Sequence, residues 1–214
     1  MATFDERAAD WDTPERIERA EAAAEAFVAA IPLEPGTRAI ELGAGTGLLG
    51  LAIRDRVGPD RLRDLLLTDA SGGMLDVAQA KVVAGGLAGV RTARFDVESD
   101  PPPAGAPFDV ALSLLLLHHV EDTPTVLRGI ARIVRPGGWI AMSDLDTEDG
   151  TFHTAEAEGI HHLGFDRADL RTQAEAAGFE EVRLSDAGEM ERDGRRYPLF
   201  LLVARRGMEA SGGP

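Results

Sequence analysis

Short apolar segments alternate along the chain with longer segments in which alanine and charged residues recur at helical spacing. The apolar segments predict β-strands, at Arg38–Leu42, Leu65–Thr68, Val90–Phe95, Phe108–Leu116 and Trp139–Ser143. The mixed segments predict helices, at Pro14–Ala30, Gly47–Val57, Gly73–Ala84 and Thr123–Val134. Strands that alternate with helices favour an α/β fold in which helices cover both faces of a parallel sheet.

The C-terminal part of the chain departs from this alternation. A helix is expected at Arg167–Ala177, where Gly178 ends it. Glu181–Ser185 and Pro198–Ala204 then predict strands, joined by a connection that carries an Asp193–Gly194 turn signal. Two successive strands without an intervening helix should pair antiparallel. We therefore expect a Rossmann-like three-layer sandwich with a mostly parallel seven-stranded sheet and an antiparallel C-terminal strand.

Composition narrows the class of function. The net charge of −15 opposes binding to nucleic acid phosphates, and basic residues occur only in short groups. No apolar run approaches the ~20 residues of a membrane span, and residues 1–12 lack a signal-peptide pattern. Cysteine is absent, which excludes disulfides and thiolate metal sites. We expect a cytoplasmic protein with no nucleic acid and no membrane partner; the oligomeric state is not readable from the sequence.

The most informative motif joins the first predicted strand to the helix after it, with the sequence Glu41-Leu42-Gly43-Ala44-Gly45-Thr46-Gly47. Glycine tolerates positive φ and lets a ligand approach the backbone closely. The helix that follows offers unpaired N–H groups in its first turn. Because ligands bind at the carboxyl ends of strands in open parallel sheets, this turn should line a ligand site.

The same glycines fit a second pattern, the dinucleotide motif G-x-G-x-x-G, through Gly45, Gly47 and Gly50. Asp69 then follows at a distance suited to a ribose. Glu41 argues against this ligand, because a carboxylate there suits an ammonium group and is poorly placed beside a pyrophosphate. The glycines also begin one turn earlier than a pyrophosphate loop requires. An NAD(P)-dependent oxidoreductase remains the alternative hypothesis.

Five motifs in order resemble those of the class I S-adenosylmethionine-dependent methyltransferases, in the group that includes the ubiquinone and menaquinone biosynthesis enzymes. They are Glu41 to Gly47, Thr68-Asp69-Ala70-Ser71 with Met74, Phe95-Asp96-Val97, Phe108 to Ser113 with Leu117-His118-His119, and Arg135-Pro136-Gly137-Gly138. The resemblance covers roughly Phe4 to Arg205. It implies S-adenosylmethionine as cofactor, S-adenosylhomocysteine as its product, and an O, N or C atom of a small molecule as methyl acceptor.

The resemblance also implies roles for single residues. The backbone of Gly43 to Gly45 would pass along the methionine part and the ribose, and Glu41 would attract the ligand ammonium. Asp69 would accept hydrogen bonds from both ribose hydroxyls, which suits its two oxygens. The residues expected to complete the cofactor site are Ala44, Gly47, Ala70, Met74, Asp96, Val97, Ser113 and Leu114. Taken singly, Asp69 can instead cap a helix, Asp96 can be a solvated charge, and Met74 can be plain core.

Methyl transfer needs a base only if the acceptor must lose a proton. His119 follows the fourth predicted strand near the expected methyl position, so it is the candidate catalytic residue, as a base or as an orienting group. A plain hydrogen bond to a loop is the alternative role. Adjacent histidines do not share one face of an element, so no metal site is expected.

The chain is interpreted as one methyltransferase domain over residues 1–214. Residues 1–35 form an N-terminal helical cap, 36–145 a cofactor-binding core, and 146–206 a substrate-side segment with the C-terminal strands. Phe4 and Trp11 either close over the ligand or pin the first helix to the core. The oxidoreductase alternative would need a Tyr–Lys pair, for which Tyr197 and Lys81 lie far apart in sequence. A binding protein without catalysis is a third hypothesis.

Overall fold

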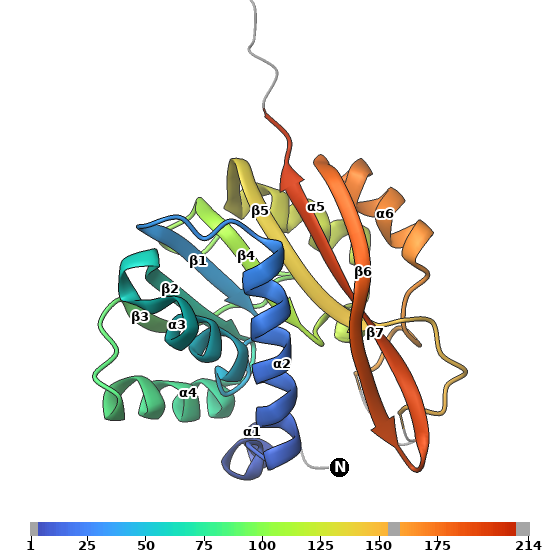
Figure 1. Ribbon diagram of the computed structural model, residues 1–214, viewed down its shortest axis with the longest axis horizontal. Helices are drawn as coiled ribbons and strands as arrows, with labels where there is room; N and C mark the ends of the chain where they lie inside the picture. Colours follow the sequence, from blue (N-terminus) through green and yellow to red (C-terminus); the bar gives the residue numbers. More distant parts are fainter. Residues whose placement is uncertain (1–3, 154–158, 209–214) are drawn as a thin grey trace, which may run out of the picture.

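A computed structural model describes residues 4–153 and 159–208. In this part of the chain, seven strands form one sheet in the spatial order β3-β2-β1-β4-β5-β7-β6 (Figure 1). The strands are β1 (Thr37–Leu42), β2 (Leu62–Asp69), β3 (Val90–Arg94), β4 (Phe108–Leu114), β5 (Val134–Leu145), β6 (Phe179–Arg192) and β7 (Arg195–Arg206). Strands β1 to β5 run parallel, and β7 lies antiparallel between β5 and β6. The expected mostly parallel sheet with an antiparallel C-terminal strand is confirmed.

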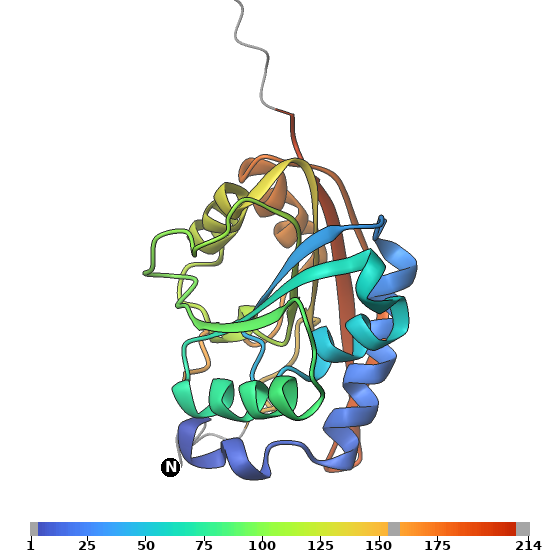
Figure 2. The ribbon, with the colours of Figure 1, turned by 90° about the vertical axis from the view of Figure 1, so that its left-hand side faces the viewer.

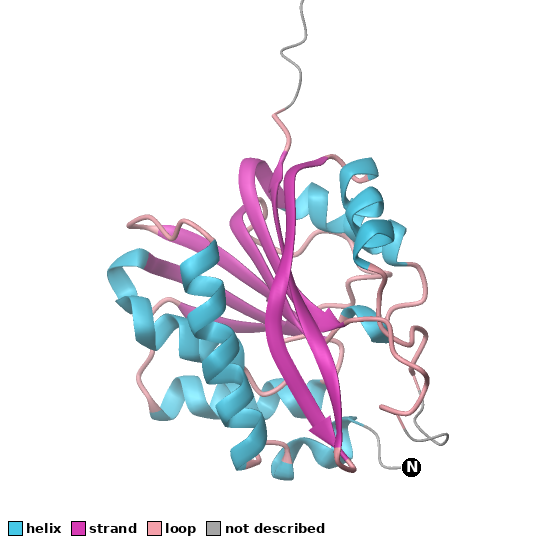
Figure 3. Ribbon diagram, turned by 45° about the vertical axis from the view of Figure 1, so that its right-hand side comes forward, coloured by secondary structure: helices cyan, strands magenta, loops and turns pink. Residues whose placement is uncertain are grey.

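Helices cover both faces of the sheet (Figure 2, Figure 3). On one face pack α2 (Pro14–Ala30), α3 (Leu48–Arg61) and α4 (Gly72–Ala84). On the other pack α5 (Thr123–Ile133) and α6 (Arg167–Ala176), whose apolar residues share a core with β4, β5 and β7. The result is the expected three-layer sandwich. Within the described residues, no helix is long and apolar enough to cross a membrane.

Several helices begin where a side chain caps free N–H groups. Thr13 accepts from the Arg16 N–H at the start of α2, and Ser71 accepts from the Met74 N–H at the start of α4. Such caps satisfy backbone donors that the helix itself leaves unpaired. α2 has the predicted bounds.

The C-terminal hairpin is longer than the pattern predicted. Residues 186–197 were expected to connect two short strands, but β6 and β7 continue through them as a two-stranded ribbon beyond the sheet (Figure 3). The ribbon closes at Asp193 and Gly194, with φ of 51° and 74°, so the predicted turn is confirmed. The ribbon was missed because charged residues, among them Glu189 paired with Arg196, hide the alternation of buried and exposed positions.

Other differences are local. β5 begins at Val134 and passes through Pro136 to Gly138, ahead of the strand predicted at Trp139–Ser143, and the pairing register with β4 shifts there. The chain also forms short elements that the apolar pattern does not show: α1 (Phe4–Arg7), η1 (Ala8–Asp10) and η2 (Leu117–His119). α1 lies beside the start of α4 in both views (Figure 1, Figure 2).

Candidate functional site

The glycine-rich turn leaves the carboxyl end of β1 and enters α3. Gly43, Gly45 and Gly47 have positive φ of 63°, 54° and 81°. A Cβ on Gly43 would lie 2.8 Å from Cδ1 of Leu116, so the turn packs tightly against the chain that follows β4. The Ala44 N–H donates to the Thr68 carbonyl at 2.8 Å, which ties the turn to β2. The loop is therefore a fixed backbone cradle that a side chain at Gly43 would disrupt.

Glu41 lies beneath this loop, with only 2% of its surface exposed. Its Oε2 accepts a hydrogen bond of 2.9 Å from the Gly50 N–H. Burial raises the pKa of the Glu41 carboxyl to about 8, although the bond from Gly50 opposes the shift. At neutral pH the carboxyl is thus mostly protonated in the protein alone, and a nearby cation would favour its ionised form.

Asp69 stands at the end of β2 beside the loop. One carboxylate oxygen accepts from the Gly45 N–H and the other from the Ser71 N–H, each at 2.8 Å. Burial raises the pKa of Asp69, and these backbone bonds oppose the increase. Each carboxylate oxygen carries a second lone pair, so the carboxylate can fix the loop and still accept a ligand hydroxyl.

Asp96 and Val97 follow β3, one strand further out. The Asp96 carboxylate accepts from the Glu98 N–H at 2.9 Å and from the Ser99 hydroxyl at 2.8 Å. Its oxygens are thus engaged by donors of its own turn. The Phe95 N–H donates to the Asp69 carbonyl at 3.1 Å, which holds this turn next to the end of β2.

The remaining expected cofactor residues differ in burial. Met74 is 1% exposed, and its Sδ lies 4.0 Å from the position of a Cβ on Gly45. Ser113, on β4, pairs in register with Leu42 of β1. Its hydroxyl is buried and has no hydrogen-bond partner within the described residues. Leu114 is half-buried and Ala70 is exposed.

The segment before α2 folds back over the loop, a feature that sequence reasoning did not resolve. The indole Nε1 of Trp11 lies 3.8 Å from the position of a Cβ on Gly45. Asp12 accepts from the Thr46 hydroxyl and forms an ion pair with Lys81, and the same ammonium donates to the Thr46 carbonyl at 2.8 Å. Thr46 lies within the glycine motif, but nothing in that motif points to Asp12, so only folding reveals this contact.

His119 lies in η2, after β4. Its Nδ1 is 2.7 Å from the Gly159 carbonyl oxygen, which can only accept, so Nδ1 carries the proton. Burial and the neighbouring His118 lower the pKa of His119 to about 4. The ring is therefore neutral at pH 7 and its Nε2 has a free lone pair. Phe4 packs edge-on against both His119 and Trp11, with centroids 5.4 and 5.7 Å apart.

A second histidine was missed as a candidate. His118 Nδ1 lies 2.7 Å from Oδ1 of Asp144, and both side chains are buried. Asp144 follows Ser143, the last residue of β5 that pairs with β4, so parallel pairing of these strands brings Asp144 near the chain that follows β4. The backbone N–H groups of His161 and His162 both donate to the His118 carbonyl. Within the described residues, no group of His, Asp or Glu has the arrangement of a metal site.

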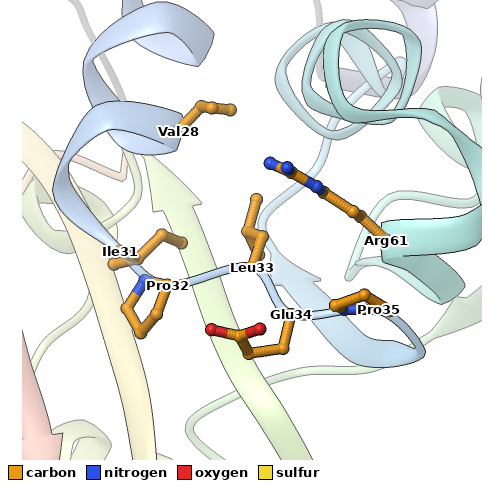
Figure 4. A pocket seen from close by; sticks show the side chains of 7 residues that line it. All are labelled: Val28, Ile31, Pro32, Leu33, Glu34, Pro35 and Arg61. Atoms are coloured by element: carbon orange, nitrogen blue, oxygen red, sulfur yellow. The ribbon is translucent and has the colours of Figure 1, made fainter.

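A pocket of about 290 Å³ lies away from these residues (Figure 4). Its lining comes from the end of α2, the connection to β1 and the end of α3, namely Val28, Ile31, Pro32, Leu33, Glu34, Pro35 and Arg61. These residues precede β1, whereas the glycine loop follows it. The pocket therefore lies near the amino end of β1, whereas the glycine loop lies at its carboxyl end. None of the candidate site residues lines the pocket.

Comparison with known proteins agrees with this arrangement. The family model described as a methyltransferase domain matches residues 40–142. The chain is 28% identical to the O-methyltransferase rstn1 of Aspergillus nomiae, over 82% of this chain and 80% of that protein. It is 32% identical to a ubiquinone/menaquinone biosynthesis C-methyltransferase of Xanthomonas campestris, over 52% of this chain and 44% of that protein. The chain thus spans less than half of the second relative.

A solved structure has the same fold. Phosphoethanolamine N-methyltransferase 2 of Haemonchus contortus, in complex with S-adenosyl-L-methionine, matches with a TM-score of 0.72 at 15% identity, over 97% of this chain and 61% of that one. The match to the methyltransferase domain and the relatives named as methyltransferases together support an enzyme of the class I S-adenosylmethionine-dependent methyltransferases, and the solved structure agrees in fold. Within the class it is similar to the ubiquinone and menaquinone biosynthesis group.

The oxidoreductase alternative is not favoured by these matches. The structure also separates its two required residues. Tyr197 lies on the C-terminal ribbon, where its hydroxyl is 2.8 Å from Thr151 Oγ1. Lys81 lies on α4 and binds Asp12 and the glycine loop. The two side chains therefore have separate partners and do not form a hydride-transfer pair.

Proposed function

We propose that this chain binds S-adenosylmethionine at the carboxyl ends of β1 and β2 and transfers its methyl group to a small molecule. The observation that carries the proposal is the joint position of Glu41, the glycine loop and Asp69. A buried acid with a raised pKa suits a ligand that brings its own cation. S-adenosylmethionine carries both an ammonium and a sulfonium, so the residues present fit this ligand.

The roles proposed for the cofactor site follow the geometry. The backbone from Gly43 to Gly47 supports the methionine part and the ribose, and Asp69 accepts from the ribose hydroxyls. Glu41 pairs with the ammonium. The adenine end is assigned to the residues at the ends of β2 and β3, and the surface beneath the ligand to the end of β4: Ala70, Met74, Asp96, Val97, Ser113 and Leu114. Because Asp96 is engaged within its own turn, the backbone of Val97 is the simpler contact there.

When bound, the cofactor supplies an activated methyl group for in-line displacement, so much of the protein's task is positioning. We propose that His119 contacts the acceptor through its free Nε2. Phe4 and Trp11 close the site from above, because they connect His119 to the glycine loop through ring contacts. In this proposal residues 1–35 cap the core formed by 36–145, and residues 146–206 shape the acceptor side.

The acceptor atom is not set by the family. The relatives include O-, C- and N-methyltransferases by name. A small-molecule acceptor is supported by the net charge of −15, which opposes nucleic acid phosphates.

The proposal is tested by isothermal titration of the purified protein with S-adenosylhomocysteine, with NAD and NADP in parallel. Micromolar binding of S-adenosylhomocysteine alone is expected. Binding of a nicotinamide dinucleotide instead would overturn the proposal. Transfer of radioactivity from methyl-labelled S-adenosylmethionine to a panel of hydroxyl, amine and activated-carbon compounds then identifies the acceptor atom.

A further inference from the structure

Three imidazoles stack on the acceptor side of the site. The ring centroids of His118 and His119 are 4.1 Å apart, and those of His118 and His153 are 5.0 Å apart. His153 comes from the segment after β5, so two separate parts of the chain build the cluster. None of the three has a role in the cofactor contacts proposed above.

The cluster borders the glycine loop. Leu116, two residues before His118, packs against Gly43, where an added Cβ would lie 2.8 to 3.2 Å from its side chain. Phe4 bridges His119 to Trp11, whose indole covers Gly45. The histidines therefore border the glycine loop, on the side where the proposed function puts the acceptor contact of His119.

Charge favours one member of the cluster as the proton carrier. Among the described residues, only His118 has a carboxylate within hydrogen-bond distance, the fully buried Asp144. His119 bonds to a neutral carbonyl, and burial lowers the pKa of both His119 and His153. Only His118 thus has a carboxylate placed to stabilise the imidazolium that would form when the ring takes a proton from an acceptor.

Asp144 also fixes the orientation of the ring. Its carboxylate accepts from the Leu145 N–H at 2.8 Å and from the His118 N–H at 3.3 Å, in addition to His118 Nδ1. Because the carboxylate is held by the backbone, it holds Nδ1–H in one tautomer and leaves Nε2 as the accepting nitrogen. This is the arrangement that a general base requires.

We propose that His118, held by Asp144, takes the proton from a hydroxyl acceptor, so that the enzyme is an O-methyltransferase for hydroxyl groups. The inference rests on the proposed function. The hydroxyl proton passes to Nε2, the oxygen forms the new O–C bond, and the S–C bond breaks with its electron pair remaining on sulfur. The imidazolium then returns the proton to solvent.

The test compares phenols of graded acidity as acceptors for the wild type and for H118N and D144N. The Asn side chain in H118N keeps a donor for Asp144, which limits the damage to folding. D149N is the matched control, because Asp149 is an exposed carboxylate in the same segment that bonds to Thr151. Affinity for S-adenosylhomocysteine is measured for every variant and is expected to stay within about twofold of wild type.

For weakly acidic phenols, H118N should lose about 10²- to 10⁴-fold in rate, the usual contribution of a general base. For strongly acidic phenols, already ionised at pH 8, the loss should be much smaller. D144N should follow the same trend and D149N should match the wild type. If D144N does not fold, the rates of H118N with phenols of graded acidity test the proposal without it. A loss that is equal across the series would indicate a structural role and overturn the proposal.

Two further outcomes also overturn it: methylation of amines or thiols alone, and absence of methylation of every hydroxyl compound in the panel. The proposed function fails differently, through loss of S-adenosylhomocysteine binding by the wild type. A protein that binds S-adenosylhomocysteine and methylates only amines would keep the proposed function and refute the hydroxyl acceptor.

Discussion

Binding of the cofactor product should be coupled to ionisation of Glu41. In the protein alone this carboxyl is buried beneath the loop, with a pKa of about 8. If the ligand ammonium pairs with it, the carboxyl must lose its proton as the complex forms. Glu41→Gln removes the ionisation and keeps the size of the side chain, so it isolates this effect.

The magnitude follows from the pKa. At pH 7 a group with a pKa of about 8 is protonated in about nine of ten molecules, so binding should release close to one proton. Ionising the carboxyl costs about 1.4 kcal/mol for each pH unit below its pKa. Affinity for S-adenosylhomocysteine should therefore rise about ninefold from pH 6 to 7 and about fivefold from pH 7 to 8, since only the ionised form pairs with the ammonium.

Calorimetry measures the released protons directly, from titrations in buffers of different ionisation enthalpy. The control ligand is 5′-methylthioadenosine, which keeps the adenosine part and lacks the amino acid. It should release no proton from Glu41, and its affinity should be the same for wild type and E41Q. With S-adenosylhomocysteine, E41Q should release no proton and bind more weakly than wild type at pH 8.

The Glu41 carboxyl should also make the stability of the folded protein depend on pH. Its pKa is raised in the folded state above the value of 4.5, so between pH 4.5 and 8 the folded state binds more protons than the unfolded state. Stability of the wild type relative to E41Q should fall as the pH rises from 4.5 to 8, and below pH 4.5 the difference should no longer depend on pH. Proton release of zero in the wild type, or a stability difference independent of pH, would refute the reasoning.

Three other predictions concern the candidate site and the packing around it, one of them with a control substitution. Asp69→Ala should weaken S-adenosylhomocysteine binding by about 1–3 kcal/mol through lost hydrogen bonds, and unchanged affinity by calorimetry would remove Asp69 from the ribose. Gly50→Ala would place a Cβ 2.3 Å from the buried Oε2 of Glu41 and should destabilise the fold by about 1–3 kcal/mol in urea unfolding. Gly72→Ala, with open space around it, is its control, and equal effects would contradict the packing argument. Ser71→Ala should cost about 1 kcal/mol through loss of the cap of α4, measured as a lower midpoint of thermal unfolding.

The sequence predicted helices and strands well where the residues that start and end them are distinctive. α2 has the predicted bounds because Thr13 and Pro14 start a helix and Pro32 prevents its continuation. The C-terminal ribbon was underestimated because it lies outside the layered core and exposes charged residues along both strands. Apolar alternation predicts a strand only where one face is buried.

The candidate site was predicted in part. The glycine loop and Asp69 meet as expected, because both follow neighbouring parallel strands. Their assignment to the cofactor stays a prediction, as does the catalytic assignment of His119. The surroundings of the acidic side chains could not be predicted from the sequence. Glu41 lies buried beneath the loop, and the Asp96 carboxylate accepts hydrogen bonds within its own turn. Burial and bonding of this kind depend on packing between distant segments.

The sequence by itself determined the order of strands and helices, the glycine loop and the end of the sheet at which a ligand would bind. These follow from periodicity, turn chemistry and chain order, which act between residues close in sequence. Only the tertiary structure decided that Asp144 holds His118, that Lys81 and Thr46 bind Asp12, and that Glu41 is shielded from water. These contacts join residues that are separated along the chain and meet only when the sheet and its covering helices have assembled, and no local pattern encodes which of them will meet.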